Sequence, residues 1–285
     1  MLDSMSVEEP IRFVKMEGVG NHFVVVDGRS RQPRDWPALA HRLCAYRTGI
    51  GADGLLVIAD SADHDARMDM YNPDGSEDFC GNGLRCVARL VAGERDADLA
   101  IDTHAGPRQS LVRFSADGTC TVRVDMGEPS FDARDVPALL ANTVDYGLDV
   151  DGREIRATTL STGTAHTILF VDRLPADSEF FRFGPLIENH RMFPERTSVM
   201  WTVVEGPHRL RLRIWERGAG ETWGCGTGAC AAAVAAIRQG LAASPVTVAS
   251  NGGELLIEWS PGERIRMTGP ANHVYDGFIA LARGH

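Results

Sequence analysis

The sequence predicts an α+β protein of two pseudo-symmetric domains, each a curled mixed β-sheet around one central apolar helix. Short β-rich segments outnumber helical ones along the 285 residues. A cysteine followed by a Gly-x-Gly turn and an apolar stretch occurs twice, as CGNG from residue 80 and CGTG from residue 225. The stretch after Cys225, GACAAAVAAIRQGL, is apolar on nearly every face, so a helix there has to be enclosed by protein. We therefore expect a sheet wrapped around each of these helices.

The elements follow from the pattern of apolar residues and turn residues. Strands are predicted at 11–16 and 23–27, with the residues VGNH as the turn between them. Further strands are predicted in runs rich in β-branched and apolar residues, at 55–60, 66–72, 99–104, 119–127, 166–172 and 210–218. Helices are predicted at 36–46, 83–93, 184–191 and 228–241. The first ten residues, MLDSMSVEEP, are expected to form a loose tail.

Composition and charge limit the class of protein. Hydrophobic residues make up 44% and charged residues 24% of the chain, as in ordinary globular proteins, and the formal net charge is -10. This acidity argues against nucleic acid or an anionic membrane as the main partner. The longest wholly apolar run, 229–237, is about half of the ~18 residues that a membrane span needs. The N-terminus lacks the features of a signal peptide, so we expect a soluble, cytoplasmic protein with six free thiols.

A thiol at a helix N-terminus has a distinct chemistry. The free N–H groups and the positive end of the helix dipole stabilise an anion there, and glycines allow the anion to come close. The thiolates of Cys80 and Cys225 are therefore expected to be favoured relative to an ordinary cysteine. Two such motifs facing each other across a cleft would place two sulfurs on opposite sides of a bound carboxylate. One thiolate can then remove a proton beside the carboxylate while the opposite thiol delivers one to the other face.

Cysteines can also serve packing, metal binding or redox chemistry. A single Cys-Gly pair in a glycine-rich loop is usually a small buried residue, but the repetition of the motif argues against packing alone. A structural zinc site and thioredoxin-like redox chemistry both need a close CxxC spacing, which the chain lacks. We predict no metal and no cofactor, and no compelling fingerprint for pyridoxal phosphate is present. The remaining cysteines are interpreted as packing residues: Cys44, Cys86, Cys120 and Cys230.

Several motifs together resemble the diaminopimelate epimerase family: YNPDGSEDFCGNGLRC, ERGAGETWGCGTGACAA, MGEP, FPER and MTGPANHVYDGFI. The similarity begins at KMEGVGNHFVVVD and covers nearly the whole chain after the tail. It implies two pseudo-symmetric domains that close over a substrate cleft, with the C-terminal strand crossing back to the first domain. We therefore expect an N-terminal domain of residues 11–127 plus 271–285 and a C-terminal domain of residues 128–270. A homodimer is the assembly that we expect.

The resemblance assigns the reacting end of the site. Cys80 and Cys225 match the family's acid/base pair of cysteines. The cradle for the substrate carboxylate is matched by the backbone of four residues: Gly81, Asn82, Gly226 and Thr227. These matches imply a cofactor-independent isomerase that inverts the α-carbon of an amino acid.

Five polar residues match the rest of the family's site. Asn21 matches a substrate-contacting asparagine, and His166 and Glu216 match active-site polar residues. Asn72 and Arg217 match residues that hold the far end of the substrate, where a planar guanidinium can grip a second carboxylate. Four of the five also fit a purely structural role. Asn72 fits a turn before Pro-Asp-Gly, His166 a core histidine, and Glu216 with Arg217 a surface ion pair.

Two positions depart clearly from the family pattern, and His22 in GNHF is a weaker departure. The chain reads GTAH where the family commonly reads GNPH, and FPERTS where it reads FPERxN, so Thr164 and Ser198 each replace an asparagine. Both belong to the far end of the site and are kept as candidate substrate contacts.

The resemblance implies interconversion of LL- and meso-diaminopimelate, which serves lysine and peptidoglycan synthesis. The alternative is a racemase of the same mechanism for an amino acid with a different side chain. A binding protein with an inactive site is a third hypothesis, against which the two intact thiols argue.

Overall fold

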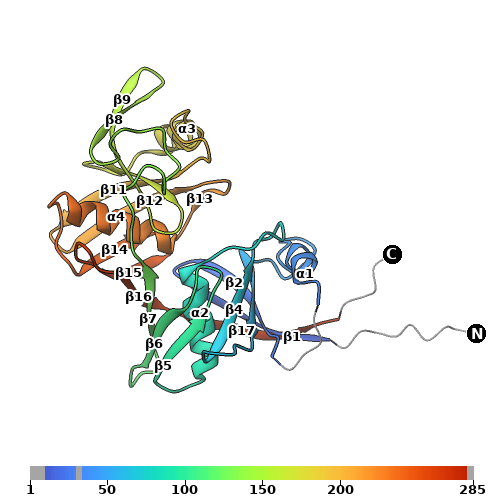
Figure 1. Cartoon of the computed structure of the whole chain (residues 1–285). Coiled ribbons are helices and arrows are strands. Elements are labelled where there is room, and N and C mark those ends of the chain that lie inside the picture. Colours follow the sequence, from blue (N-terminus) through green and yellow to red (C-terminus); the bar gives the residue numbers. More distant parts are fainter. Residues whose placement is uncertain (1–9, 30–33, 281–285) are drawn as a thin grey trace, which may run out of the picture.

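The computed structural model describes residues 10–29 and 34–280. The predicted tail, apart from Pro10, lies outside the described residues, as do the last five residues of the predicted N-terminal domain. Within the described residues, seventeen strands form a mixed sheet, and two of the four helices are central to it. This arrangement confirms the predicted fold class. Figure 1 shows the elements in two groups, one around each of these helices.

The first half of the chain forms the group in the lower part of Figure 1. Its elements are β1 (Ile11–Gly18), β2 (Asn21–Asp27), α1 (Trp36–Leu43), β3 (Gly54–Ala59), β4 (Ala66–Tyr71), α2 (Gly81–Ala92), β5 (Ala97–Asp102), β6 (Arg108–Phe114) and β7 (Cys120–Gly127). The second half contains β8 (Tyr146–Val150), β9 (Arg153–Ser161), β10 (Ala165–Phe170), α3 (Asp177–Glu188), β11 (Ser198–Gly206), β12 (Arg209–Glu216), β13 (Gly220–Thr222), α4 (Gly226–Arg238), β14 (Val246–Ser250), β15 (Gly253–Glu258), β16 (Ile265–Pro270) and β17 (Asn272–Ile279).

Two strand pairings join the halves. β16 pairs antiparallel with β7, with Met267 opposite Val124, so the sheet continues from one half into the other. β17 then pairs antiparallel with β1, starting with Ile279 opposite Ile11. The last described strand therefore returns to the first half, as the family resemblance implies (Figure 1). The exact domain boundaries stay a prediction.

The two central helices lie in the core. Residues 231–236 of α4 are fully buried, which confirms that this helix is enclosed on all sides. The core around them is continuous: one cluster of buried apolar side chains includes Leu84 of α2 and Val234 of α4 together with strands of both halves. The alanines of α4 present little volume, so the surrounding strands can pack close to the helix axis.

Element boundaries differ from the sequence-based ones in places. The helix α1 ends at Leu43, three residues earlier than predicted, and α3 begins at Asp177, seven residues before the predicted start. The Gly184–Pro185 pair favours a helix start, but both residues lie inside α3. Gly184 is there for packing, because a Cβ on it would lie 2.5 Å from the ring of Trp215. Several strands of the second half, including β9 and β11, fall outside the predicted runs.

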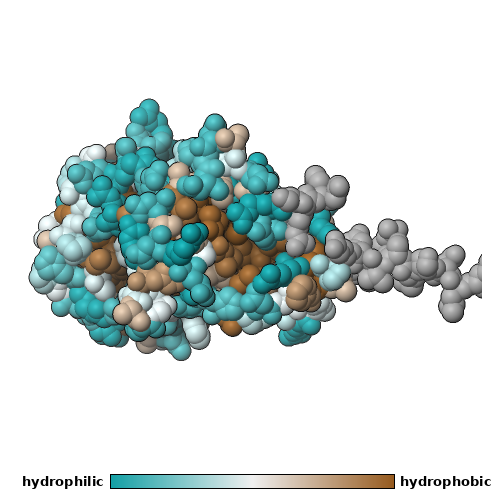
Figure 2. Space-filling view, turned by 90° about the horizontal axis from the view of Figure 1, so that it is seen from below, coloured by the Kyte–Doolittle hydropathy of each residue, from teal (hydrophilic) through white to brown (hydrophobic). Residues whose placement is uncertain are grey.

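The surface carries both polar and apolar areas. Figure 2 shows hydrophobic residues gathered in a band across one face, with hydrophilic residues on either side. Exposed large hydrophobic side chains include Val274, Tyr275 and Phe278, all on β17. None of the helices in the described part of the chain is long and apolar enough to cross a membrane.

We predict that Leu84→Ala lowers the free energy of unfolding by about 2–5 kcal/mol, because it leaves a cavity in the hydrophobic core next to α2. Leu84 is fully buried, whereas Leu241 is 42% exposed and serves as the control. Leu241→Ala should change the unfolding free energy by less than about 0.5 kcal/mol. Urea unfolding followed by circular dichroism measures both, and equal effects of the two substitutions would contradict the assignment of the core.

Candidate active site

The N-termini of α2 and α4 meet inside the molecule. Each helix begins directly after its cysteine, and Cys80 and Cys225 occupy the N-cap positions in extended backbone conformation. A Cβ built on Gly226 would lie 2.8 Å from Oδ1 of Asn82, so the first turns of the two helices are in contact. Both helix starts also lie against the side chain of Met267 on β16. The two cysteine motifs therefore face each other, as the sequence predicts.

The turn between β1 and β2 packs on the loop that precedes Cys225. Val19 has a φ of 52°, in the left-handed region that a β-branched residue rarely adopts. Its carbonyl lies so close to Gly224 that a side chain at position 224 would collide with it. This contact brings Asn21, two residues after Val19, into the space between the two halves.

Cys80 faces a side-chain amide. Its Sγ donates a hydrogen bond to Oδ1 of Asn21 at 3.5 Å, and Nδ2 of Asn82 donates to the same oxygen at 3.4 Å. The Asn82 side chain is 1% exposed, and its own Oδ1 has no hydrogen-bond partner among the described residues. A buried amide oxygen without a partner is costly, so it marks a polar spot within reach of both helix starts.

Cys225 has different neighbours. The N–H of Gly228 donates to its Sγ at 3.3 Å, and Oγ1 of Thr227 lies 3.4 Å from the sulfur. The charge of the Glu216 carboxylate, which lies on β12, also acts on this thiol. Oγ1 of Thr222 donates to the same carboxylate at 2.5 Å. Glu216 is therefore the main charged neighbour of Cys225, whereas Cys80 donates its hydrogen bond to a neutral amide.

Burial changes the acidity of both thiols. It raises the pKa of Cys80 to about 11, although the backbone N–H groups of Asn82 and Gly83 act in the opposite direction. It also raises the pKa of Cys225, and the nearby charge of Glu216 adds to this increase. The sequence-based expectation of favoured thiolates is therefore wrong at both positions, because the loss of hydration outweighs the effect of the helix N-terminus.

The predicted carboxylate cradle lies at the two helix starts. Gly81 and Asn82 begin α2, and Gly226 and Thr227 begin α4, so their N–H groups are among those that lack a partner within the helix. Three of the four residues are buried and Thr227 is half-buried. Two helix N-termini in contact concentrate N–H donors and positive dipole ends in one place, which suits an anion such as a carboxylate.

In the second half, hydrogen bonds and strand pairing connect four of the predicted site residues. Oγ1 of Thr164 is 3.0 Å from Nε2 of His166, and His166 pairs with Ser198 in the β10–β11 register. Oγ of Ser198 accepts a hydrogen bond from the backbone N–H of Arg217 at 3.1 Å. Burial lowers the pKa of His166 to about 3, so the imidazole is neutral, and its buried Nδ1 has no partner in the described part of the chain. Thr164 and Ser198, which stand where the family has asparagines, therefore contact two residues matched to the family's site, His166 and Arg217.

Asn72 is placed differently from the rest of the candidates. Its Nδ2 donates to Oγ of Ser76 at 3.1 Å and lies 3.5 Å from Oδ2 of Asp78, and its carbonyl accepts from the N–H of Gly75. These partners all belong to the turn after β4. The structure therefore accounts for Asn72 as a turn residue, while any contact with a substrate stays a prediction.

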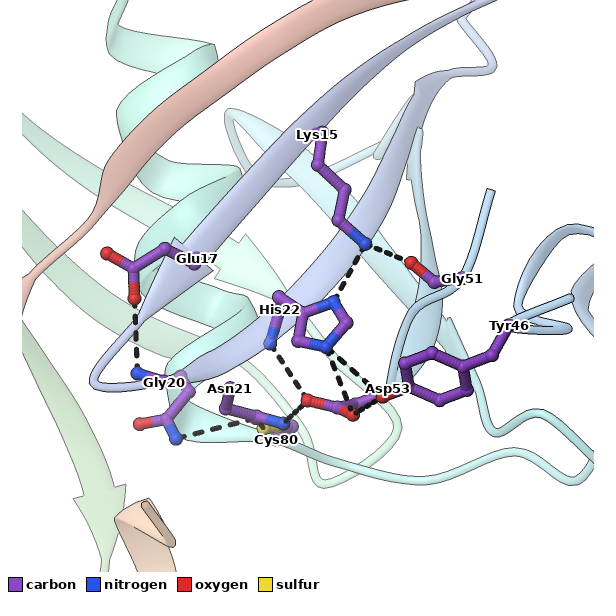
Figure 3. A network of polar contacts seen from close by, with 10 residues as sticks. Lys15, Glu17, Gly20, Asn21, His22, Tyr46, Gly51, Asp53 and Cys80 are labelled. Atoms are coloured by element: carbon purple, nitrogen blue, oxygen red, sulfur yellow. Dashed lines mark hydrogen bonds and ion pairs between the residues drawn. The ribbon is translucent and has the colours of Figure 1, made fainter. Parts of the chain in front are cut away.

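Sequence reasoning missed a group of polar residues in the first half. Figure 3 shows Lys15, His22, Tyr46 and Asp53 in a hydrogen-bonded network that continues through Asn21 to Cys80. Of these four, the family pattern draws attention to His22 alone, as a weak departure. The sequence signal that could have revealed this network is the presence of Lys15 and Asp53 beside otherwise apolar strands. Lys15 is only 7% exposed in the structure.

Sequence comparison identifies close relatives. The sequence model of the family described as diaminopimelate epimerase matches residues 13–131 and 158–274. The diaminopimelate epimerase of Desulfitobacterium hafniense is 43% identical over 278 residues, which cover 94% of this chain and 98% of the relative. The one of Moorella thermoacetica is 42% identical over 284 residues, which cover 95% and 100%.

Solved structures with low sequence identity share the fold. A hydroxyproline epimerase from Agrobacterium vitis superposes with a TM-score of 0.70 at 16% identity and covers 96% of this chain and 94% of its own. A PhzF-family phenazine biosynthesis protein from Bacillus anthracis has a TM-score of 0.67 at 17% identity, with coverages of 96% and 100%. Because the family model matches both halves and the relatives match nearly end to end, the chain belongs to the diaminopimelate epimerase family of isomerases.

Proposed function

We propose that this protein is a diaminopimelate epimerase, which interconverts LL- and meso-diaminopimelate without a cofactor and so serves lysine and peptidoglycan synthesis. One observation carries the proposal: two helices, each headed by a cysteine, touch at their N-termini, where Gly226 packs on Asn82. Membership in the family supports the choice of substrate. Cys80 and Cys225 are the proposed acid/base pair.

The proposed reaction moves one proton off the α-carbon and another proton onto it. A thiolate on one side takes the α-proton, and the electron pair of the C–H bond passes into the substrate carboxylate. The N–H groups of the two helix starts hold that carboxylate and stabilise its growing negative charge. The opposite thiol gives its proton to the other face of the carbon, which inverts the centre. The first sulfur ends as a thiol and the second as a thiolate, so the reverse reaction uses the same groups with exchanged roles.

Glu216 is proposed to help form the Cys225 thiolate. Burial raises the pKa of Glu216, so this carboxylate accepts a proton more readily than an exposed one. Transfer of the Cys225 proton to Glu216 keeps the number of negative charges in the site constant. A thiolate beside a charged carboxylate would instead place two like charges close together in a buried site.

The far end of the substrate is assigned to polar residues of both halves. Arg217 supplies a guanidinium for the second carboxylate, and its Nη1 now donates to the carbonyl of Glu195 at 3.0 Å. The remaining proposed contacts are Asn21, Asn72, Thr164, His166 and Ser198. The second candidate function, racemisation of an amino acid with another side chain, is favoured by the hydroxyls that stand at Thr164 and Ser198 in place of amides.

Assembly and compartment form part of the proposal. We place the enzyme in the cytoplasm as a homodimer, with residues 11–127 plus 271–285 and residues 128–270 as its domains. All six cysteines are free, which supports a reducing compartment. The exposed apolar side chains of β17 support self-association, and the net charge of -10 argues against nucleic acid as a partner.

Cys80→Ser and Cys225→Ser should each lower epimerisation of diaminopimelate at least about a thousandfold, because a hydroxyl is far too weak an acid to replace a thiol. Turnover is followed in deuterated water by α-proton exchange and by chirality of the product. Cys120→Ala, at a buried packing cysteine of β7, is the matched control and should stay within about threefold of the wild type. Near-normal turnover in either serine variant would exclude the two-thiol mechanism.

The pH dependence of alkylation tests the acidity of Cys80. Its raised pKa leaves the thiol protonated at neutral pH, so its reaction with iodoacetamide should speed up about tenfold per pH unit and level off near pH 11. The same peptide in urea-unfolded protein should level off near the ordinary value of ~8.5. Peptide mass spectrometry across a pH series measures both. A midpoint in the folded protein below that of the unfolded one would show that the helix N-terminus outweighs burial.

The double variant Thr164→Asn with Ser198→Asn tests the substrate. If diaminopimelate is the substrate, the hydroxyls already suffice, and kcat/KM for diaminopimelate should stay the same or fall. If the enzyme acts on another side chain, two regained amides should raise kcat/KM for diaminopimelate by roughly tenfold to a hundredfold, since a hydrogen bond to a charged group contributes about 1.5–3 kcal/mol. A panel of amino acids assayed with wild type and variant decides between the two. Wild-type turnover of another amino acid about a hundredfold faster than that of diaminopimelate would reject our choice.

A further inference from the structure

A chain of hydrogen bonds leads from a buried lysine toward Cys80 (Figure 3). Nζ of Lys15 on β1 lies 2.7 Å from Nδ1 of His22 on β2 and also donates to the carbonyl of Gly51. On the other side of the imidazole, Nε2 lies 3.2 Å from the hydroxyl of Tyr46. That hydroxyl is 3.1 Å from Oδ1 of Asp53, the residue just before β3. The network therefore joins β1 and β2 to the segment between α1 and β3, beside the site.

The chemistry of the groups fixes the direction of each bond. An ammonium group only donates, so Nδ1 of His22 accepts from Lys15 and the ring proton lies on Nε2. Nε2 then donates to Tyr46, and the phenol donates to the carboxylate of Asp53. Burial lowers the pKa of His22, which agrees with a neutral imidazole. From Lys15 through His22 to Tyr46, each group therefore donates its hydrogen bond in the direction of the Asp53 carboxylate.

Asp53 in turn determines how the Asn21 amide is oriented. Its Oδ2 accepts from Nδ2 of Asn21 at 2.6 Å and from the backbone N–H of His22 at 2.9 Å. A carboxylate only accepts, so the NH2 end of the Asn21 amide has to face Asp53. The carbonyl end consequently faces the Cys80 sulfur, where Nδ2 of Asn82 supports it as well.

We propose that Asp53 is a positioning residue for the proposed proton transfer: by holding the NH2 group of Asn21, it keeps the Asn21 carbonyl oxygen directed at the Cys80 thiol. An acceptor at this place binds the S–H form of cysteine and disfavours the thiolate. An amide turned the other way would direct its NH2 group at the sulfur and favour the thiolate. Asp53 thus keeps Cys80 in its proton-donor form until a substrate lies between the thiols. Only the role of Asp53 in proton transfer rests on the proposed function, and the orientation of the Asn21 amide does not.

The test compares Asp53→Ala with Asp53→Asn. The alanine variant removes the acceptor and frees the Asn21 amide to turn, so the pH midpoint of Cys80 alkylation should fall by about one unit, a tenfold gain in thiolate at neutral pH. The asparagine variant loses the charge but keeps an oxygen for the Asn21 NH2 group, and its midpoint should stay within a few tenths of the wild type. Cys225 in the same samples is the internal control and should not shift.

A double-mutant cycle separates orientation from charge. Asn21 is partly exposed at the first position of β2, so Asn21→Ala should fold, and it should lower the Cys80 midpoint because it removes the acceptor itself. In that background Asp53→Ala should add no further shift, since no amide remains to be oriented. The charged groups that also lie near the sulfur, Glu216 on β12 and Arg85 on α2, are unchanged in all variants.

Three results would overturn the proposal. These are an unchanged midpoint in Asn21→Ala, an equal fall in Asp53→Asn and Asp53→Ala, and a full additional shift from Asp53→Ala in the Asn21→Ala background. If Asp53→Ala does not fold alone, the isosteric Asp53→Asn can still be compared with Asn21→Ala, and an equal fall in that pair would count against the proposal in the same way.

Alkylation needs no substrate, so the test of Asp53 is separate from the test of the proposed function. Epimerase assays on the same samples report on that function. An inactive wild type would reject the function, while the Cys80 midpoints would still decide the role of Asp53.

Discussion

The contact between the starts of α2 and α4 is the interaction on which the rest of the structure depends. Gly226 packs directly on Asn82, so each half has to deliver a helix N-terminus to the same point. A helix can begin inside a protein only if other parts of the protein cover its sides. The fully buried alanines of α4 show that this helix is covered in that way. The crossing strands β16 and β17 then fix the halves to each other through β7 and β1.

Enclosure at the helix starts has two opposing effects on the thiols. Helix N–H groups favour an anion, but removal of water disfavours it, and for Cys80 the second effect is the larger. The same exclusion of water strengthens every hydrogen bond that a bound carboxylate would accept. Two protonated thiols, with Cys225 buried and Cys80 partly buried, are therefore consistent with the proposed site, which generates its thiolate by proton transfer to a neighbour such as Glu216 rather than by exchange with bulk water.

The sequence predicts the parts of the fold that rest on strong local patterns. The repeated Cys-Gly-x-Gly motif and the apolar stretch after Cys225 locate both central helices to within two residues at their starts. The start of α3 is not predictable in this way, because Gly184 serves the ring of Trp215, a long-range contact with no local signature. The network around Asp53 has no local signature either, since its members come from separate segments. The acidity of the thiols is beyond sequence patterns because burial is a property of the whole fold.

The two cysteines hold equivalent places in a pseudo-symmetric frame but differ in their hydrogen-bond partners. Cys225 faces the carboxylate of Glu216, which can take its proton, whereas Cys80 faces the carbonyl of Asn21, which cannot. Equal partners would leave both sulfurs in the same state, and inversion needs one base and one acid at the same moment. In the proposed mechanism, this difference in partners favours Cys225 as the base and Cys80 as the acid. Because each sulfur would take the other's state after one turnover of the proposed reaction, the partners bias only the starting arrangement and leave both directions of that reaction open.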